Sequence, residues 1–470
     1  MKIRTRFAPS PTGYMHIGNL RTALYSYLIA KQDNGDFILR IEDTDQKREV
    51  KDAIDLIYQV LKETGLQWDE GPQTGGTFGP YIQSQRLDIY HDYAKKLIEL
   101  GGAHYCFCLD EIEDQDPCLH LSQQEIQTRI ANGEPYVIRQ TIPQTGITSF
   151  DDQVYGHIEV QNNTLNEGIL IKSDGYPTYN FANVIDDHLM QITHVVRGNE
   201  YLSSTPKYNL IYQAFGWDIP VYIHLPSVNK DETHKLSKRH GDASYQDLKS
   251  QGFLTEAIIN YIALLGWSPQ EDEMLSLQDL ITQFDIKHIS KSPAIFDIEK
   301  LKWMNGMYLR QMPLSTFHQL LRPYYNFIKQ PVDLLEISRV LQPRLLQVNQ
   351  DIIQDMLDFI NQPYPFDITI FSHKKFKTTP EKSLNALLLV QEQLPYLKDF
   401  QDDDLILQFF MTIAKDNHLK NGQVMEPVRA ALTHKRSSAG GAVELVHIFG
   451  KNETLKRLNQ TIHDLKNNLS

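Results

Sequence analysis

Three charged residues stand where three predicted strands end. Arg6 closes a short strand near the N-terminus, Glu42 follows the strand FILRI, and Arg197 follows the strand ITHVV. Because the carboxyl ends of parallel strands meet at one edge of a sheet, these side chains would converge on one crevice. Two guanidinium groups can bind carboxylates, and a carboxylate can hold an ammonium group. Each residue taken alone could instead form a salt bridge at the edge of the sheet.

The loop after the first strand, APSPTGYMHIG, suits a phosphate. Pro9 and Pro11 stiffen it, while Gly13 and Gly18 let the backbone approach a ligand closely. The helix that begins at His16 directs its N-terminal amides and the positive end of its dipole at the same crevice. His16 adds a donor for a phosphate or ribose oxygen. The alternative is an ordinary turn with a solvated histidine.

A second stretch, HKLSKRHGD at 234–242, is compact and basic. It places Lys235, Lys238 and Arg239 between the α/β part of the chain and its helical half. A short basic run by itself is usually a solvated turn. Together with the His16 loop, it predicts a nucleotide site built from two segments about 220 positions apart.

The three cysteines and one histidine have metal-ligand spacing. Cys106 and Cys108 form C-x-C, and Cys118 and His120 form C-x-H after a nine-residue gap. Thiolates and an imidazole at these spacings predict a structural, tetrahedral zinc site. The alternative is three buried free thiols and a surface histidine. The close spacing of the cysteines is unlike a secreted disulfide framework.

The elements that would position these residues alternate at the N-terminal end. They are predicted in the order strand, helix, strand, helix: Ile3–Phe7, His16–Gln32, Phe37–Ile41 and Val50–Leu61. This order predicts an α/β fold with a doubly wound parallel sheet of the Rossmann type.

An α+β insertion interrupts that order, and all-α C-terminal domains follow it. The insertion carries a polar helix over 122–132 and strand-like runs, before the α/β pattern resumes with ITHVV, a helix over 205–215 and VYIHL. The expected domains are 1–88 and 179–232 for the two halves of the split α/β domain, 89–178 for the insertion, 233–315 for the segment that carries the basic loop, and 316–375 and 376–470 for two helical domains.

Composition limits the function classes. The 470 residues carry 46 basic and 59 acidic side chains, a net charge of −13. This balance disfavours indiscriminate nucleic-acid binding, although it permits a specific complex. No apolar run approaches 18 residues, and MKIRTRF has no apolar leader segment, so we expect a cytoplasmic protein without a membrane partner.

The two loops resemble the "HIGH" and "KMSKS" signatures of class I aminoacyl-tRNA synthetases. These stand here as HIGN from His16 and KLSKR from Lys235, with departures at Asn19, Leu236 and Arg239 that the glutamyl branch tolerates. RFAPSPTG, RTAL, FILRIEDTD, WDEGP, TYNFAN and INYIALLGW are also similar to bacterial glutamyl-tRNA synthetases. The resemblance runs almost from end to end.

The resemblance implies roles for individual residues. It implies a glutamate site formed by Arg6, Ala8, Ser10, Glu42, Tyr179, Asn183 and Arg197. It implies an ATP site formed by His16, Gly18, Glu200, Lys235 and Lys238, all but Glu200 acting in catalysis. It implies zinc at Cys106, Cys108, Cys118 and His120, in an insertion that contacts the tRNA acceptor end.

The implied reaction is ATP-dependent attachment of L-glutamate to tRNA(Glu) through a glutamyl-adenylate, with Mg²⁺ accompanying ATP. The resemblance also implies a stem-contact domain at 233–315, helical anticodon-binding domains at 316–375 and 376–470, and a monomer. Basic residues of the helical half could contact tRNA phosphates: Arg339, Arg344, Lys374, Lys375, Lys377, Arg429, His434, Lys435 and Arg436.

Three other classes compete with this interpretation. The shorter glutamyl-queuosine enzymes lack a C-terminal half, whereas this chain has more than 150 residues there. Metabolic nucleotidyltransferases share the helix start but not TYNFAN. A catalytically silent tRNA-binding paralogue would not need His16, Glu42, Arg197 and Lys238 intact. The sequence leaves open whether tRNA(Gln) is also charged.

Overall fold

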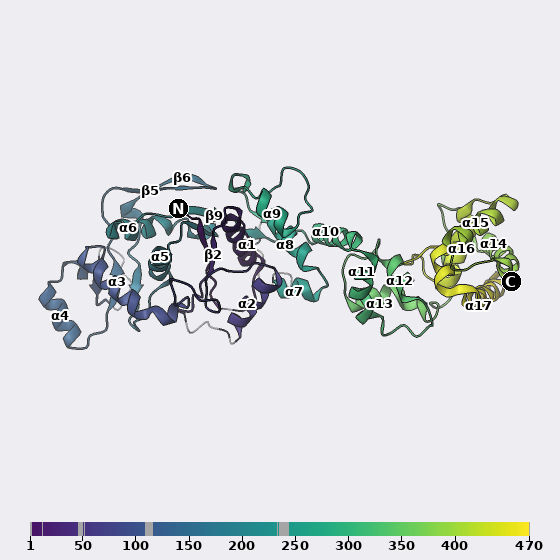
Figure 1. The fold of residues 1–470 in the computed structure, drawn as a ribbon, viewed down its shortest axis with the longest axis horizontal. Helices are drawn as coiled ribbons and strands as arrows, with labels where there is room; N and C mark the ends of the chain where they lie inside the picture. The colour runs from purple at the N-terminus through teal and green to yellow at the C-terminus, as the bar shows by residue number, and fades with distance from the viewer. Residues whose placement is uncertain are drawn as a thin grey trace. The chain divides into compact units, whose positions relative to one another are not determined.

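The computed structural model describes residues 2–11, 13–45, 50, 52–108, 116–232, 234 and 244–469. The chain forms two compact units (Figure 1). A catalytic unit comprises Met1–Lys249 and Leu254–Leu301, and a helical unit comprises Ser250–Phe253 and Lys302–Ser470. The finer domain boundaries expected from the sequence stay predictions.

Four parallel strands organise the catalytic unit. β1 (Arg4–Phe7) pairs with β2 (Asp36–Leu39), and β8 (His194–Gly198) pairs with β9 (Val221–Leu225). The amide of Thr193 donates to the carbonyl of Arg4 at 2.9 Å, which places β1 beside β8. The spatial order is therefore β2, β1, β8, β9, the doubly wound arrangement predicted from the sequence.

Helices follow these strands in the sequence, and the first of them packs against β1, β2 and β8. They are α1 (Ile17–Gln32), α2 (Ala53–Glu63), α3 (Leu87–Glu99), α5 (Tyr179–Leu189) and α6 (Thr205–Phe215), with short 3-10 turns at Gln83–Arg86 and Asn199–Tyr201. The helix expected from Val50 begins three residues later, because Asp52 has a φ of 67° and cannot belong to a right-handed helix.

The insertion is less separate than the sequence suggested. β3 (Ala103–Cys106), β4 (Val137–Gln140) and β7 (Ile169–Ile171) form an antiparallel sheet, and α4 spans Gln123–Ala131. The hairpin of β5 (Ile147–Asp152) and β6 (Gly156–Gln161) instead extends the catalytic sheet, since Asp152 of β5 pairs in parallel with Tyr222 of β9.

One apolar core joins the insertion to the catalytic sheet. Side chains of α3, β3, β4 and β7 pack with those of α5 and α6; the most buried include Tyr90, Leu97, Leu170, Phe181, Val184 and Ile185. Burying each large side chain of this kind contributes about 1.5–3 kcal/mol. The core fixes α5, whose first turn faces the amino-acid crevice.

The remaining elements of the catalytic unit precede and follow the basic loop in the sequence. β10 (Val228–Asn229) pairs with β11 (Ala294–Ile295), and α7 (Tyr245–Ser250), α8 (Thr255–Ala263) and α9 (Leu277–Gln283) follow. α8 is buried from Ala257 to Ala263.

The described part of the second unit is helical and contains no named strand. α10 (Ile298–Gln311) leads into it, and its helices are α11 (Leu314–Leu321), α12 (Leu334–Leu341), α13 (Gln350–Leu357), α14 (Pro380–Gln393), α15 (Asp403–Asp416), α16 (Asn421–Thr433) and α17 (Ala442–Leu469). α17 breaks at Gly450, whose φ is 63°. Within the described ranges, no helix has the length and hydropathy needed to cross a membrane.

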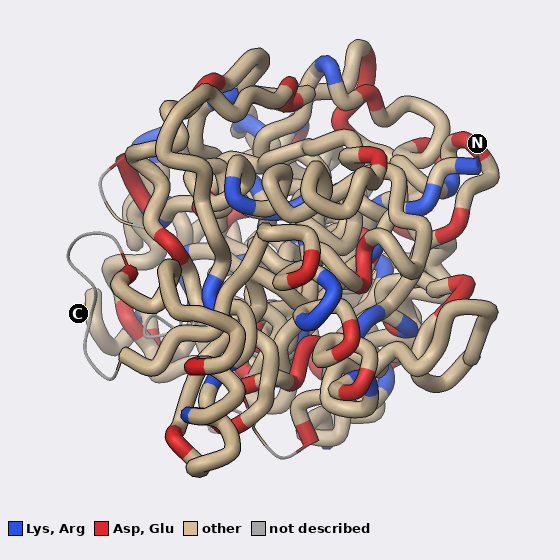
Figure 2. The backbone as a smooth tube through the Cα atoms, turned by 90° about the vertical axis from the view of Figure 1, so that its left-hand side faces the viewer, with Lys and Arg blue, Asp and Glu red and all other residues tan. Residues whose placement is uncertain are grey.

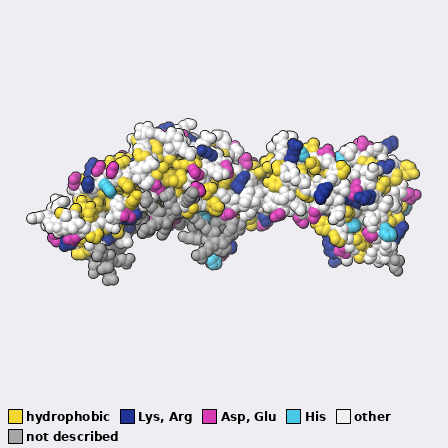
Figure 3. Space-filling view, turned by 90° about the horizontal axis from the view of Figure 1, so that it is seen from below, with side chains coloured by type: hydrophobic (Ala, Val, Ile, Leu, Met, Phe, Trp, Pro, Cys, Tyr) yellow, Lys and Arg dark blue, Asp and Glu magenta, His cyan; other side chains and the backbone are white. Residues whose placement is uncertain are grey.

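Charge is distributed rather than segregated. Acidic and basic residues alternate along the backbone in the view of Figure 2. The face drawn in Figure 3 likewise mixes both signs over each unit. A net charge of −13 therefore coexists with local groups of cations.

Candidate active site and cysteine cluster

Arg6 and Glu42 are joined through two further charged residues. Nε of Arg6 donates to both carboxylate oxygens of Asp187 at 3.1 and 3.3 Å, and Nη1 donates to the Val196 carbonyl at 3.2 Å. Asp187 also accepts from Nη1 of Arg40 at 2.8 Å, while Nη2 of Arg40 donates to Glu42 at 3.1 Å. The four groups form one buried chain of alternating charge.

Burial and neighbouring charges set the ionisation of this chain. Burial raises the pKa of Glu42 to about 7, against the opposing effect of Arg40 and Arg6. Burial also disfavours the charged form of Asp187, but Arg6 and Arg40 outweigh it and lower that pKa. Arg40 keeps a raised pKa despite complete burial, because Asp187, Glu42 and Asp186 surround it.

Arg197 is held by two neutral groups and three aromatic rings. Its Nε donates to Nε2 of His224 at 3.0 Å, and its Nη2 donates to the hydroxyl of Thr205 at 2.8 Å. The guanidinium lies 4.8–5.4 Å from ring centroids of three tyrosines, Tyr208, Tyr222 and Tyr201. Such contacts favour a cation that is only 5% exposed.

Both arginines retain donor capacity towards a ligand. The described residues accept from Nε and Nη1 of Arg6 and from Nε and Nη2 of Arg197. Nη2 of Arg6 and Nη1 of Arg197 have no acceptor among the described residues. A small dicarboxylate could accept from both, which is the arrangement that the strand-end argument predicted.

Tyr179 and Asn183 lie on the same face of α5, as their spacing predicted. Nδ2 of Asn183 donates to the Tyr179 carbonyl at 2.6 Å, and the rings of Tyr179 and Tyr201 lie 5.1 Å apart. Burial raises the pKa of Tyr179 well above its usual value, and the charge of Glu42 raises it further. The phenol therefore stays protonated beside Glu42.

Ala8 and Ser10 flank this corner of the site. The carbonyl of Pro9 between them accepts from the Glu42 amide at 3.0 Å, which continues the pairing of β1 and β2 past the ends of both strands. Ala8 is half-buried and Ser10 is exposed. Two of the expected glutamate-site residues thus lie directly beside Glu42 in the backbone.

His16 caps the helix that faces the crevice. It precedes α1 with an extended backbone, and its Nδ1 accepts from the Gly18 amide at 3.2 Å. Because Nδ1 accepts a hydrogen bond, the neutral ring carries its proton on Nε2. This tautomer can donate to a phosphate oxygen, as the sequence predicted.

The basic loop from Lys235 onwards lies outside the described residues, and so do Lys238 and Arg239. Ser244, the first described residue after it, forms an antiparallel bridge with His16, and the amide of Tyr245 donates to the Met15 carbonyl at 3.2 Å. The segment that follows the basic loop therefore lies beside the loop that contains His16.

Arg21 and Glu200, the latter one of the ATP-site candidates, lie close enough for the charge of Glu200 to act on Arg21. Arg21 of α1 is buried and donates from Nη1 to the Leu265 carbonyl at 2.7 Å and from Nη2 to the Pro226 carbonyl, which ties the first helix to the segment after β9. Glu200 is exposed, and its carboxylate lies so close to Gly198 that a side chain there would overlap it.

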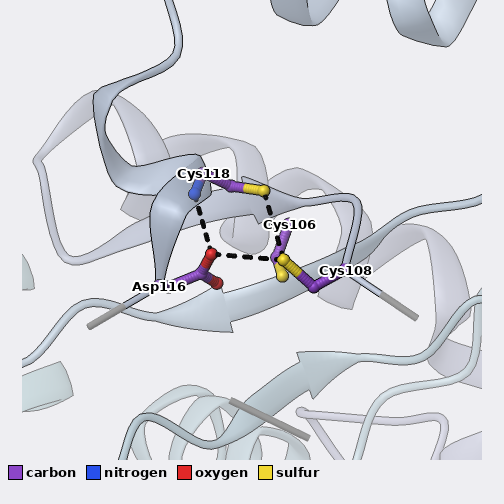
Figure 4. A group of neighbouring side chains, drawn as sticks. All are labelled: Cys106, Cys108, Asp116 and Cys118. Atoms are coloured by element: carbon purple, nitrogen blue, oxygen red, sulfur yellow. Dashed lines mark hydrogen bonds between the residues drawn. The ribbon is translucent and has the colours of Figure 1, made fainter. Parts of the chain in front are cut away.

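The three cysteines meet, together with an aspartate (Figure 4). Donor atoms of Cys106, Cys108, Cys118 and Asp116 all lie within 4.8 Å of one another. The thiols of Cys108 and Cys118 are 3.7 Å apart. Three soft sulfur donors and one carboxylate are a suitable set for Zn²⁺.

The fourth position of this group differs from the sequence-based expectation. The exposed His120 is not a member of the group, whereas Asp116 is buried and directed towards the thiols. Oδ1 of Asp116 accepts from the Cys118 amide at 2.8 Å, and Oδ2 lies 3.0 Å from Nε2 of His104. Sequence spacing missed Asp116 because C-x-H suggested the histidine.

Most basic residues proposed for tRNA contact in the helical unit have internal partners. Arg339 pairs with Glu336 and Asp403, Arg429 with Glu426, and Lys435 with Asp358. Three of these residues are exposed together on one turn, closed by a bridge from His373 to Thr378: Lys374, Lys375 and Lys377. Nζ of Lys375 lies 5.6 Å from the ring centroid of Phe376.

Comparison with protein families identifies the class. The model described as "tRNA synthetases class I (E and Q), catalytic domain" matches residues 2–303, and the model described as "Anticodon binding domain" matches residues 316–462. The chain therefore belongs to the class I tRNA synthetases of the E and Q type. The predicted family and fold class are confirmed.

Particular relatives cover the chain from end to end. A glutamate–tRNA ligase of Clostridium botulinum strain Hall is 54% identical, and one of Clostridium acetobutylicum is 53% identical; each match covers 99% of both chains. A crystal structure of a glutamate tRNA ligase from Elizabethkingia meningosepticum, in complex with its amino acid, has a TM-score of 0.89 at 35% identity, and covers 99% of this chain and all of the other.

Proposed function

We propose that this enzyme attaches L-glutamate to tRNA(Glu) in two steps, through a glutamyl-adenylate, with release of pyrophosphate and AMP. The observation that carries this proposal is the convergence of Arg6, Glu42 and Arg197 beside the capped start of α1. The full-length similarity to glutamate–tRNA ligases supports the same substrate pair.

The crevice offers a separate partner for each of the three charged groups of glutamate. Arg6 and Arg197 each offer a guanidinium nitrogen to a carboxylate, and Glu42 accepts from the ammonium group. The phenol of Tyr179 and the amide of Asn183 complete the pocket, and Ala8 and Ser10 border it. A neutral side chain such as that of glutamine would leave a buried guanidinium without its anion, which costs affinity.

The first step joins the amino acid to the α-phosphorus of ATP. A carboxylate oxygen of glutamate attacks, and pyrophosphate leaves. Nε2–H of His16, the amides near Gly18, and Lys235 and Lys238 of the basic loop stabilise the phosphate charge, and Glu200 borders the ATP site. Mg²⁺ bound with ATP would neutralise further phosphate charge. The second step transfers the acyl group to the terminal ribose hydroxyl of tRNA.

The remainder of the chain binds tRNA. We assign the insertion to the acceptor end and the helical unit to the anticodon, consistent with the anticodon-binding family match. The exposed turn with Lys374, Lys375 and Lys377 is suited to backbone phosphates. We expect the enzyme to act as a monomer.

The cysteine cluster is proposed to hold a structural zinc ion. Cys106, Cys108 and Cys118 supply three thiolates, and Asp116 is placed to supply the fourth ligand unless His120 replaces it. All positions would be filled by protein, so the ion would stabilise the insertion rather than take part in the reaction.

Glutamate-dependent exchange of pyrophosphate into ATP, measured with and without tRNA, tests the reaction. The proposal predicts exchange with glutamate when tRNA(Glu) is present, and esterification of that tRNA at its 3′ end. Exchange with glutamate but without any tRNA charging would instead favour a nucleotidyltransferase. Modification of a tRNA base would favour the glutamyl-queuosine class.

Replacement of the second signature lysine tests the ATP site. Lys238→Ala should lower kcat by about 10³-fold, an activation cost of about 4 kcal/mol, because a phosphate-stabilising cation is lost. The affinity for glutamate, measured by equilibrium dialysis, should change little. An unaltered kcat would contradict the role assigned to Lys238.

Metal analysis and two variants test the zinc proposal. We expect about one zinc ion per chain, and a lower thermal midpoint after chelation. Asp116→Ala should weaken zinc retention, whereas His120→Ala should not; the opposite pattern would restore His120 as the ligand. Protein prepared without chelators that contains no zinc would refute the proposed site.

A further inference from the structure

A buried histidine lies behind one of the substrate arginines. His224 of β9 is fully buried, and its Nε2 lies 3.0 Å from Nε of Arg197. Its Nδ1 lies 2.6 Å from Oδ2 of Asp152, a residue of β5 that is 3% exposed. The three side chains form a line from the insertion to the amino-acid site.

The hydrogen-bond directions along this line are determined. Nε of an arginine can only donate, so Nε2 of His224 must accept, and the imidazole proton is on Nδ1. That proton points at the Asp152 carboxylate, which can only accept. The hydroxyl of Thr205 lies 3.3 Å from Nε2, but it donates at a shorter 2.9 Å to the Tyr201 carbonyl.

The electrostatic surroundings favour the same neutral ring. Burial lowers the pKa of His224, the Asp152 hydrogen bond opposes this effect, and the charge of Arg197 lowers the pKa again. An imidazolium would place a second N–H, and a second positive charge, against Nε of Arg197. The orientation of Arg197 thus depends on an uncharged His224 in one tautomer.

We propose that His224 and Asp152 are positioning residues for glutamate binding: Asp152 fixes the Nδ1–H tautomer of His224, and His224 fixes the guanidinium of Arg197. The nitrogen of Arg197 that has no described acceptor is then held towards the amino acid. Because Asp152 belongs to the insertion, the insertion contributes to the amino-acid site. This inference rests on the proposed binding of glutamate by Arg197.

Asp152 also has a structural role, which governs the choice of variants. Its Oδ1 accepts from the amides of Val154 and Tyr155 at 2.9 and 2.8 Å, and its Oδ2 accepts from the His224 amide at 3.1 Å. Removing the carboxylate would disturb the turn after β5. Variants of His224 separate the two roles because they leave these backbone contacts intact.

Two isosteric variants of His224 form the test. In His224→Gln, Oε1 takes the place of Nε2 and still accepts from Arg197, but the bond to Asp152 is lost. In His224→Asn, the amide takes the place of Nδ1 and keeps the bond to Asp152, but the acceptor for Arg197 is lost. His157→Asn is the control, since His157 lies exposed on the neighbouring β6 strand.

We expect His224→Asn and His224→Gln to differ in their steady-state kinetics. His224→Asn should raise the KM for glutamate by about tenfold or more, the loss of a hydrogen bond to a charged group, with the KM for ATP unchanged. His224→Gln should stay within about threefold of the native protein, and His157→Asn should match it. Equal glutamate KM values for the Asn variant and the native protein would overturn the inference.

Two further measurements separate the possible failures. If Arg197→Ala leaves the glutamate KM unchanged, the proposed role of Arg197 is wrong; if it raises KM while His224→Asn does not, only the positioning inference fails. Nitrogen-15 NMR of histidine-labelled protein, assigned with His224→Gln, should show Nδ1 protonated and Nε2 unprotonated. The opposite tautomer would overturn the inference even if every variant lost activity.

Discussion

Two buried arginines, Arg40 in the catalytic unit and Arg457 in the helical unit, have different kinds of partner. In the catalytic unit, Arg40 is surrounded by carboxylates: Asp187 at 2.8 Å, Glu42 at 3.1 Å and Asp186 at 3.6 Å. In the helical unit, Arg457 donates mainly to backbone carbonyls, those of Phe359, Ile360 and Leu432, at 2.7–2.8 Å, and Glu453 is its carboxylate partner within the described part of the chain.

The difference separates two uses of a buried charge. Backbone carbonyls are fixed by the fold, so a guanidinium that satisfies them connects segments and has no remaining function. Side-chain carboxylates in a crevice hold neighbouring arginines in orientations that leave donors for a ligand. We infer that Arg457 stabilises the helical unit, whereas the network around Arg40 prepares the amino-acid site.

Removing the structural arginine should have the largest effect on stability. Arg457→Met would leave three buried carbonyls without a donor and should lower the free energy of unfolding of the helical unit by about 3–5 kcal/mol. Thermal unfolding followed by circular dichroism measures the change. Lys456→Met is the matched control, because Lys456 also contacts Glu453 but its side chain is 73% exposed.

Equal losses of stability in Arg457→Met and Lys456→Met would contradict the structural role inferred for Arg457. Loss of glutamate-dependent activity in Arg457→Met, without any loss of stability, would also show that carbonyl partners do not identify structural arginines. We expect the control to remain within about 0.5 kcal/mol of the native protein.

The next largest effect of the carboxylate network around Arg40 is expected in the pH dependence of glutamate binding. The ammonium group needs ionised Glu42, whose pKa of about 7 means that the free site is largely protonated below that pH. Binding must therefore expel a proton, and the KM for glutamate should fall about tenfold per pH unit as pH rises towards 7, then level off. Glu42→Gln should bind weakly at every pH.

The same group has an opposite effect on the stability of the free protein. Its folded pKa is raised above the ordinary value of 4.5, so the folded state holds a proton that the unfolded chain has lost. The contribution of Glu42 to stability is present below pH 4.5 and declines as pH rises towards 7.

A KM for glutamate that is flat from pH 5.5 to 8 would contradict the role assigned to Glu42 in binding the ammonium group.

The sequence predicted the charged residues at the strand ends, but it did not predict the residues that hydrogen-bond to them. Arg6, Glu42 and Arg197 follow apolar runs, and the rule that strand ends share one edge needs no knowledge of distant pairing. Arg40, Asp187 and His224 matter because segments far apart in sequence meet, as in the contact of Arg6 with Asp187, 181 residues away. The one local signal was a charged residue inside the buried run FILRI.

The insertion illustrates a second reason for partial prediction. Its strands were evident, but their partners were not, because alternation along a strand does not specify which strand lies beside it. Pairing of β5 with β9 places Asp152 beneath the active site. Asp116 was likewise missed, since carboxylates are common and its position among the thiols depends on the turn of the chain before Cys118.

One paired measurement tests the central claim directly: kcat/KM for glutamate and the thermal midpoint, both determined for Arg197→Met. The account predicts that kcat/KM falls about 10²-fold or more, since about 3 kcal/mol of charge-assisted binding is lost, while the midpoint falls far less than in Arg457→Met. An unchanged kcat/KM, or a loss of stability as large as that of Arg457→Met, would contradict it.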